Sequence, residues 1–206
     1  MTLRMKLYGT PLSGHAHRIV LALSFLGLKA EIVNVNLREG EHHTDAFRAI
    51  NPEGKVPVLV DGEVTIYEST AILTYLGTKY DDGTWLPRDP VLLAEVQKWF
   101  IWSASELAPG AARARITRLF GAPFDLATAQ EIGRAFLEKL NRSLDGRDFL
   151  VGDRATFADV AIYSYVAHAP EGGLPLEPYP HVQAWISRIE QLDGFIPMPK
   201  TPAVAA

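Results

Sequence analysis

The feature that most constrains this 206-residue chain is NPEGKVPVLVDGEVTIYESTAILTYL, the segment from Asn51 to Leu76. It opens on an Asn-Pro-Glu-Gly turn signal and continues with two β-branched runs, Val56–Val60 and Val64–Tyr67. The intervening Asp61-Gly62 is the strongest short-range signal for a β-hairpin. A helical pattern follows from Glu68-Ser69, with apolar residues on one face. The segment therefore predicts a turn, a hairpin and a helix in direct succession.

The residues before this segment predict alternating strands and helices. Met5–Gly9 alternates like a strand, His17–Leu28 has helical apolar spacing, and Glu31–Leu37 is β-branched. A strand, a helix and a strand within about 35 residues are typical of a βαβ unit with parallel strands. With a short helix over Thr44–Ile50, the order becomes β-α-β-α-β-β-α, an α/β unit.

The second half of the chain predicts helices only. Asp81–Asp89 is rich in Asp, Gly and Pro and is the best domain boundary, which gives domains at 1–80 and 90–206 with a linker at 81–89. Helical spacing follows over Pro90–Ser105, Thr128–Leu144 and Tyr179–Leu192. Before a further apolar run, Thr156 and Asp159 have the spacing of a capping box, so Asp159 is expected to be structural rather than catalytic.

Composition narrows the possible functions. The net charge is −4 without a basic block, which argues against a nucleic-acid partner, and no apolar run is long enough to span a membrane. The chain has no cysteine, which excludes disulfides, thiolate metal sites and a cysteine nucleophile. A cytoplasmic protein is expected.

The motifs GKVPVL-x-DG and ES-x-AI-x-x-YL resemble the glutathione-binding half of the glutathione S-transferases. The resemblance covers nearly the whole chain and is strongest from Lys6 to Tyr80. It implies a thioredoxin-like N-terminal domain, an all-helical C-terminal domain and a serine-type, theta-, zeta- or phi-like bacterial branch. Glutathione would be the co-substrate in a detoxification reaction.

The resemblance also implies roles for residues of the turn, hairpin and helix. The Val56–Pro57 bond would be cis, and the backbone of Val56 would pair with the cysteinyl part of glutathione. Glu68 and Ser69 would bind the ammonium and carboxylate of the γ-glutamyl end, at a helix start that favours anions. In isolation, this pair would more simply cap the helix.

Ser13 is the expected catalytic residue. It precedes Arg18 by the spacing found in serine-type branches, and its hydroxyl would donate a hydrogen bond to the glutathione sulfur and favour the thiolate. Tyr8 is the alternative donor, as in tyrosine-type branches. His15 and His17 could also modulate the thiolate, although histidines that open a helix usually lie at the surface.

Two further positions resemble contacts to the glycine carboxylate of glutathione. His42 fits by position, His43 could replace it, and Lys55 could supply charge. No third ligand follows the histidine pair at metal spacing, so a metal site is not expected.

The pocket for the second substrate should be apolar and come mainly from the helical domain. Trp99 is expected in the core rather than in the pocket. The pocket candidates are Leu12, Ile101, Trp102, Ser105, Phe120 and Phe124.

The expected function is conjugation of the glutathione thiolate to a small hydrophobic electrophile. Glutathione-dependent isomerisation or peroxide reduction is the alternative reaction, and a non-enzymatic binding protein of the same fold is the alternative class. The resemblance further implies a homodimer with surfaces between Tyr67 and Tyr80 and along Pro90–Ser105.

Overall fold

A computed structural model describes residues 5–201 and divides the chain into two compact units. The first contains residues up to Gly83 together with Asp193–Pro199. The second contains Thr84–Leu192 and the segment from Lys200. The chain thus returns to the first unit after it has completed the helices of the second.

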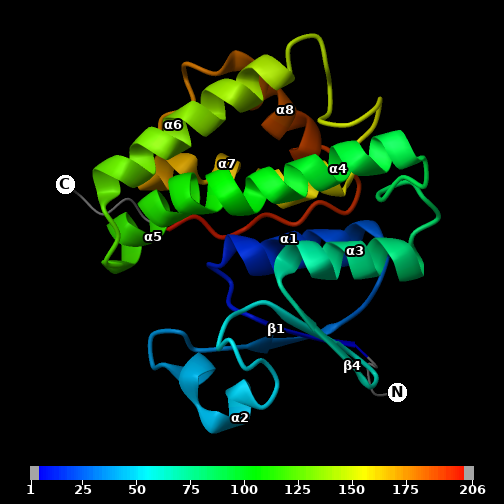
Figure 1. Cartoon of the computed structure of the whole chain (residues 1–206), viewed down its shortest axis with the longest axis vertical. Coiled ribbons are helices and arrows are strands. Elements are labelled where there is room, and N and C mark those ends of the chain that lie inside the picture. Colours follow the sequence, from blue (N-terminus) through cyan, green and yellow to red (C-terminus); the bar gives the residue numbers. More distant parts are fainter. Residues whose placement is uncertain (1–4, 202–206) are drawn as a thin grey trace. The chain divides into compact units, whose positions relative to one another are not determined.

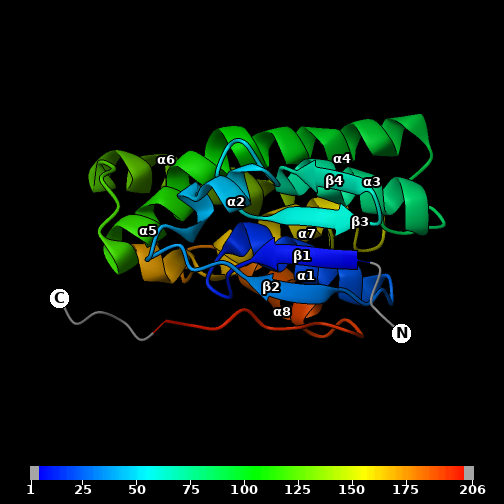
Figure 2. The ribbon, with the colours of Figure 1, turned by 90° about the horizontal axis from the view of Figure 1, so that it is seen from below.

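The first unit is built on a four-stranded mixed sheet in the order β2-β1-β3-β4 (Figure 2). β1 (Met5–Gly9) pairs in parallel with β2 (Glu31–Asn34) and antiparallel with β3 (Val58–Asp61), which pairs antiparallel with β4 (Val64–Tyr67). The parallel βαβ unit and the Asp-Gly hairpin are therefore both confirmed. β2 ends at Asn34, earlier than expected.

Helices cover both faces of this sheet, as in a thioredoxin-like fold. α1 (Gly14–Phe25) and α3 (Ser69–Tyr80) lie side by side on one face, while α2 (Asp45–Arg48), preceded by the turn η1 (Glu41–His43), lies on the other (Figure 1). Phe47 of α2 joins a buried apolar cluster with two residues of the sheet region, Val35 and Val58.

α1 begins three residues before the position that its apolar pattern indicated. Ser13 is its N-cap, and the Ser13 Oγ accepts a hydrogen bond from the amide of Ala16 at 3.2 Å. Gly9, at the end of β1, lies so close to α1 that a Cβ there would meet the Ala16 Cβ at 2.8 Å. The cap and this close approach fix where α1 starts relative to the sheet.

Hydrogen bonds attach the segment 193–199 to α1. The Ser24 hydroxyl donates to the carbonyl of Gly194 at 2.6 Å, and the His17 Nε2 lies 2.7 Å from the carbonyl of Ile196. A carbonyl only accepts, so the His17 Nε2 carries the hydrogen. His17 is only 5% exposed, so the expectation of a surface position was wrong for this residue: its ring is needed to hold the returning chain.

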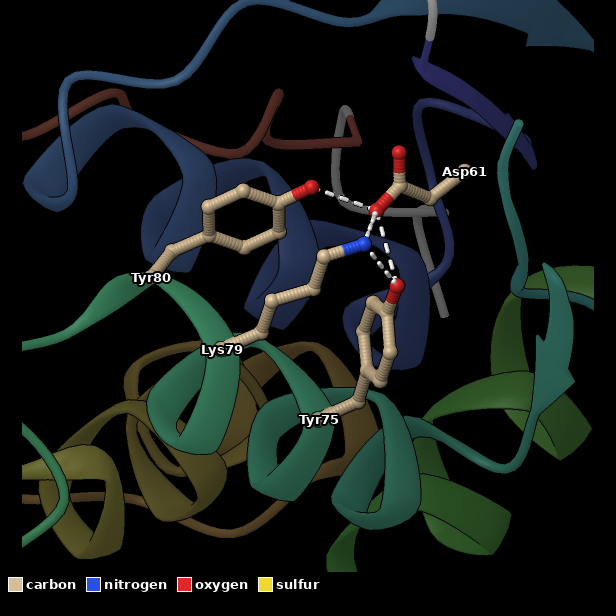
Figure 3. Close-up of polar contacts among 4 residues, drawn as sticks. All are labelled: Asp61, Tyr75, Lys79 and Tyr80. Carbon is tan, nitrogen blue, oxygen red and sulfur yellow. Dashed lines mark hydrogen bonds and ion pairs between the residues drawn. The ribbon is translucent and has the colours of Figure 1, made fainter.

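The hairpin is joined to the C-terminal end of α3 by one buried carboxylate, that of Asp61 (Figure 3). Its Oδ2 accepts hydrogen bonds from Lys79 Nζ at 2.6 Å, from the Tyr75 hydroxyl at 2.8 Å and from the Tyr80 hydroxyl. Burial by itself would raise the pKa of Asp61, but the donors Lys79, Tyr80 and Tyr75 outweigh it and lower the pKa to about 2.

This cluster predicts a pH-dependent contribution to stability. The pKa of Asp61 is about 2 in the fold against an ordinary 3.8. Its contribution is therefore complete above about pH 5, and it is lost as the pH falls toward 2. Asp61→Asn should lower the free energy of unfolding by about 2 kcal/mol at pH 6, and the difference from wild type should shrink at pH 3.

Urea unfolding at the two pH values measures this difference. Asp153→Asn is the matched control because the side chain of Asp153 is 92% exposed, and it should match wild type at both pH values. A deficit of Asp61→Asn that is equal at pH 6 and pH 3 would contradict the account.

The second unit is helical in all its regular elements within the described residues. After α4 the helix continues as wide π-type turns in η2. η2 contains Pro109, which has no amide hydrogen to donate to the usual helical hydrogen bond. None of the helices within residues 5–201 is long and apolar enough to cross a membrane. The elements are α4 (Pro90–Trp102), η2 (Ser103–Ala112), α5 (Arg113–Phe120), α6 (Leu126–Ser143), α7 (Phe157–Ala167), η3 (Ala169–Gly172) and α8 (Pro180–Glu190).

α7 is the core helix of this unit and packs against α4, η2 and α8 (Figure 1). Its start carries the expected capping box: the Thr156 amide donates to Asp159 Oδ2 at 2.8 Å, and the Thr156 side chain caps the helix. Asp159 also accepts hydrogen bonds from the Leu150 amide at 3.0 Å and from Trp185 Nε1 at 2.8 Å. The structural role predicted for Asp159 is confirmed.

Candidate functional site

The N-terminus of α1 presents the Ser13 hydroxyl. A lone pair of the Ser13 Oγ accepts the capping hydrogen bond from the Ala16 amide. The hydroxyl hydrogen of Ser13 can still be donated to another group. Ser13 is half-buried, so the group is sheltered but not enclosed. Capping and hydrogen-bond donation to a ligand are therefore compatible in the same side chain.

The N-terminus of α3 lies against α1 through a buried arginine. Arg18 is 1% exposed, and its Nη1 donates to the Ser69 Oγ at 3.0 Å. The same Nη1 lies 3.0 Å from His15 Nδ1, which is in turn 3.4 Å from the Ser69 Oγ. These contacts hold the start of α3 next to the first turn of α1.

His15 is the titratable member of this group. Burial, and to a lesser extent the positive charge of Arg18, lower the pKa of His15 to about 3. The imidazole is therefore neutral at neutral pH, and Arg18 supplies the positive charge among these three side chains.

Glu68, the N-cap residue of α3, has an unusual backbone conformation. Its φ is 68° and its ψ is 116°, and within residues 5–201 it is the only non-glycine residue with positive φ. Such a conformation costs about 1–3 kcal/mol and persists where the surroundings impose it, often at functional sites. The side chain of Glu68 is exposed and so accessible to a ligand cation.

The turn before β3 is held by Asn51. The Asn51 Nδ2 donates to the carbonyl of Lys55 at 2.8 Å, and its Oδ1 accepts from the Glu53 amide at 3.1 Å. The Val56–Pro57 peptide bond that follows is cis, as the resemblance implied. Val56 is half-buried and lies two residues before Val58, the first residue of β3.

The η1 turn brings both candidate histidines to this turn. A Cβ on Gly54 would lie 2.9 Å from the His42 carbonyl and 3.3 Å from His43 Nδ1, with Arg48 Nε at 3.8 Å. Burial, then His43 and Arg48, lower the pKa of His42. Nδ1 of His42 is buried without a hydrogen-bond partner among the described residues. His42, with His43 as its alternative, stays a predicted ligand residue.

Comparison with known proteins decides the family. Residues 3–78 match the family model "Glutathione S-transferase, N-terminal domain", and residues 125–193 match "Glutathione S-transferase, C-terminal domain". Glutathione S-transferase 3 of Zea mays is 32% identical over 222 residues, which cover 98% of this chain and 99% of that relative. The chain belongs to the glutathione S-transferase family.

Solved glutathione S-transferase structures share the fold. The enzyme from Pseudomonas fluorescens superposes with a TM-score of 0.90 at 33% identity, covering 96% of this chain and 100% of that one. A glutathione transferase homologue of Drosophila mojavensis, solved with bound glutathione, has a TM-score of 0.84 at 26% identity, covering 93% and 90%. The thioredoxin-like plus all-helical fold expected from the sequence is confirmed.

Tyr8, the alternative donor, lies on the other face of the sheet from α1. Its half-buried ring packs against the cluster of Val35, Phe47 and Val58, and it meets the Phe47 ring edge-on at 6.4 Å between centroids. This packing places the Tyr8 ring on the side of the sheet covered by α2, and Ser13 stays the predicted donor.

The candidates for the electrophile pocket stay predictions. Trp99 is 2% exposed and belongs to the core, as expected. Trp102 lies under two ammonium groups, with Lys139 Nζ at 4.5 Å and Lys98 Nζ at 5.3 Å from its ring centroid. Three other candidates are exposed in the helical unit, namely Ile101, Phe120 and Phe124.

Two features of the site were not predicted from the sequence: the contacts of His15 and Arg18 with Ser69, and the position of Arg48 beside the histidine pair. The spacing of Arg18 after Ser13 was the available signal for the first. For Arg48 the surrounding sequence gave no signal, since an arginine at the end of a short helix is ordinarily a solvated surface residue.

The strain at Glu68 predicts opposite effects on stability and binding. Glu68→Gly should raise the free energy of unfolding by about 1 kcal/mol because glycine accepts positive φ without strain. It should also weaken glutathione binding about tenfold, through loss of a charge-assisted hydrogen bond to the ammonium group. Thermal unfolding and calorimetric titration measure the two effects.

Glu68→Gln is the matched control for this prediction. It keeps the Cβ and hence the strain, so its stability should equal that of wild type while its affinity falls. If Glu68→Gly is no more stable than Glu68→Gln, the backbone of Glu68 is not strained in the way described.

Proposed function

We propose that this chain transfers the thiolate of glutathione to a small hydrophobic electrophile, with Ser13 as the hydrogen-bond donor to the sulfur. The observation that carries the proposal is the contact between Arg18 and Ser69, which holds the N-termini of α1 and α3 together. Two helix N-termini side by side favour two anionic groups on one ligand. Glutathione carries two such groups, a thiolate and a γ-glutamyl carboxylate.

Each part of glutathione has a matching group in the first unit. The Ser69 hydroxyl would bind the γ-glutamyl carboxylate, and the exposed Glu68 carboxylate would bind the ammonium group. The backbone of Val56, two residues before the start of β3, would pair with the cysteinyl residue as an added strand. His42 or His43, with Lys55, would face the glycine carboxylate.

The chemistry follows from stabilisation of the thiolate. An ordinary thiol has a pKa of about 8.5, so a donor and a helix N-terminus that favour the anion make it abundant near neutrality. The thiol proton passes to solvent, and the sulfur lone pair then forms a carbon–sulfur bond at the electrophilic carbon. A leaving group departs with its bonding electrons, or, in an addition, the adjacent atom takes up a proton from solvent.

The second substrate and the dimer belong to the same proposal. The electrophile would lie against apolar side chains of the helical unit. Exposed apolar residues support a protein interface: Tyr67 and Tyr80 in the first unit, and Val91 and Ile101 in the second. Light scattering should give twice the chain mass.

Two measurements test the proposed function. Calorimetric titration should show one glutathione per chain, and mixing with an activated aryl chloride should give a thioether whose formation requires both substrates. Binding without thioether formation for any activated halide, epoxide or enone would contradict the transferase proposal and leave a binding protein. Absence of glutathione binding would contradict both.

A further inference from the structure

The contacts of His15 fix which of its nitrogens carries the hydrogen. The Arg18 guanidinium has only donors, and its Nη1 lies 3.0 Å from His15 Nδ1. Nδ1 must therefore accept, so the imidazole is neutral with its hydrogen on Nε2. The low pKa of His15 agrees with this geometry, since a second hydrogen on the ring would point at the donor of Arg18.

The same geometry determines how the Ser69 hydroxyl is used. Nη1 of Arg18 carries two hydrogens and can serve both His15 Nδ1 and the Ser69 Oγ, each at 3.0 Å. Nδ1 has one lone pair, which Arg18 occupies, and it lies 3.4 Å from the Ser69 Oγ, a long contact. Neither His15 nor Arg18 offers a good acceptor to the Ser69 hydroxyl. The hydroxyl hydrogen can therefore be donated to an acceptor outside these three side chains.

We infer that His15 is a positioning residue for glutathione binding: it orients the Arg18 guanidinium, which in turn presents the Ser69 hydroxyl as a donor to the γ-glutamyl carboxylate. The inference rests on the proposed function. His15 and Arg18 lie one turn apart on α1, so their pairing is local, whereas Ser69 belongs to α3. His15 acts through Ser69 and does not touch the sulfur.

A double-mutant cycle tests this role. His15→Leu should raise the calorimetric Kd for glutathione about fivefold, the effect of one lost hydrogen bond, while kcat at saturating glutathione stays within about twofold. In a Ser69→Ala background the same substitution should change Kd by less than about twofold, because its target is already gone. His15→Asn, whose Oδ1 is an acceptor near the place of Nδ1, should restore most of the affinity.

Controls separate positioning from folding. His181→Leu makes the same substitution in the helical unit, where the side chain of His181 is 44% exposed, and should leave Kd unchanged. Thermal unfolding shows whether each variant is folded. If His15→Leu fails to fold, His15→Asn and His15→Gln carry the test: asparagine should bind like wild type, and glutamine, whose acceptor is displaced, should bind less tightly.

Several outcomes would overturn the inference. One is that His15→Leu raises the Kd for glutathione by the same factor in the wild-type and in the Ser69→Ala background. Others are an unchanged Kd in His15→Leu, or equal binding by the asparagine and glutamine variants. If Ser69→Ala leaves Kd unchanged while wild type still forms the thioether, the inference fails and the transferase function stands. If no thioether forms but the effects of His15→Leu and Ser69→Ala on Kd are still coupled, the proposed function is contradicted and the inference is supported.

Discussion

Replacing Ser13 with alanine should lower kcat/KM for transfer about 10- to 100-fold at pH 6.5, while the Kd for glutathione changes by less than about threefold. The hydroxyl is expected to bind the thiolate rather than the tripeptide as a whole, so its loss mainly reduces the fraction of sulfur that is ionised. The deficit should shrink as the pH rises toward 9, where even an ordinary thiol ionises. A pH series of thioether formation measures this.

Ser13 also caps α1, so its two roles must be separated. Alanine should cost about 1 kcal/mol of stability through loss of the cap. Ser13→Asp keeps the capping oxygen but places a negative charge beside the sulfur, so it should be as stable as wild type and nearly inactive. If Ser13→Ala is fully active and Tyr8→Phe is inactive, Tyr8 is the donor.

Asp159→Ala should give the largest loss of stability, about 3–5 kcal/mol. The carboxylate accepts from the Thr156 amide, the Leu150 amide and Trp185 Nε1, all buried at the start of the core helix α7. Alanine would leave these donors unpaired and remove the capping box. Urea unfolding of wild type and variant measures the difference.

Two milder substitutions should give smaller losses of stability than Asp159→Ala. Asp159→Asn keeps one oxygen acceptor and should cost less than alanine. Thr156→Ala removes only the side-chain cap and should cost about 1 kcal/mol. A cost below 1 kcal/mol for Asp159→Ala would show that the network does not stabilise the helical unit. The residues proposed to bind glutathione lie in the first unit, so a folded Asp159→Asn variant should keep its affinity for glutathione.

Local signals made much of the fold predictable. The Asp-Gly turn, the β-branched runs beside it and the Thr156–Asp159 spacing each act over a few residues. Each predicted element formed, although β3 begins at Val58 rather than at Val56. The start of α1 did not follow its apolar pattern, because the capping Ser13 is followed by Gly14 and His15, which carry no apolar signal. A polar first turn therefore prevents the apolar periodicity from indicating where a helix begins.

Contacts between distant residues were beyond prediction. The segment 193–199 joins the first unit through the His17 contact with Ile196, 179 positions away in sequence. At the candidate site, the sequence predicted three separate residues, Ser13, Glu68 and Ser69. It gave no sign of the positive φ at Glu68, a conformation usual for glycine, or of the Arg18 contact that joins the two helix starts.

The ionisation of the bound glutathione sulfur is the most direct test of the account. Ultraviolet titration of the thiolate in the complex should give a thiol pKa about one to two below the ordinary 8.5, and the Ser13→Ala complex should move back toward that ordinary value. A bound thiol that titrates near 8.5 in wild type would contradict thiolate stabilisation by Ser13 and the α1 N-terminus, and with it the proposed mechanism.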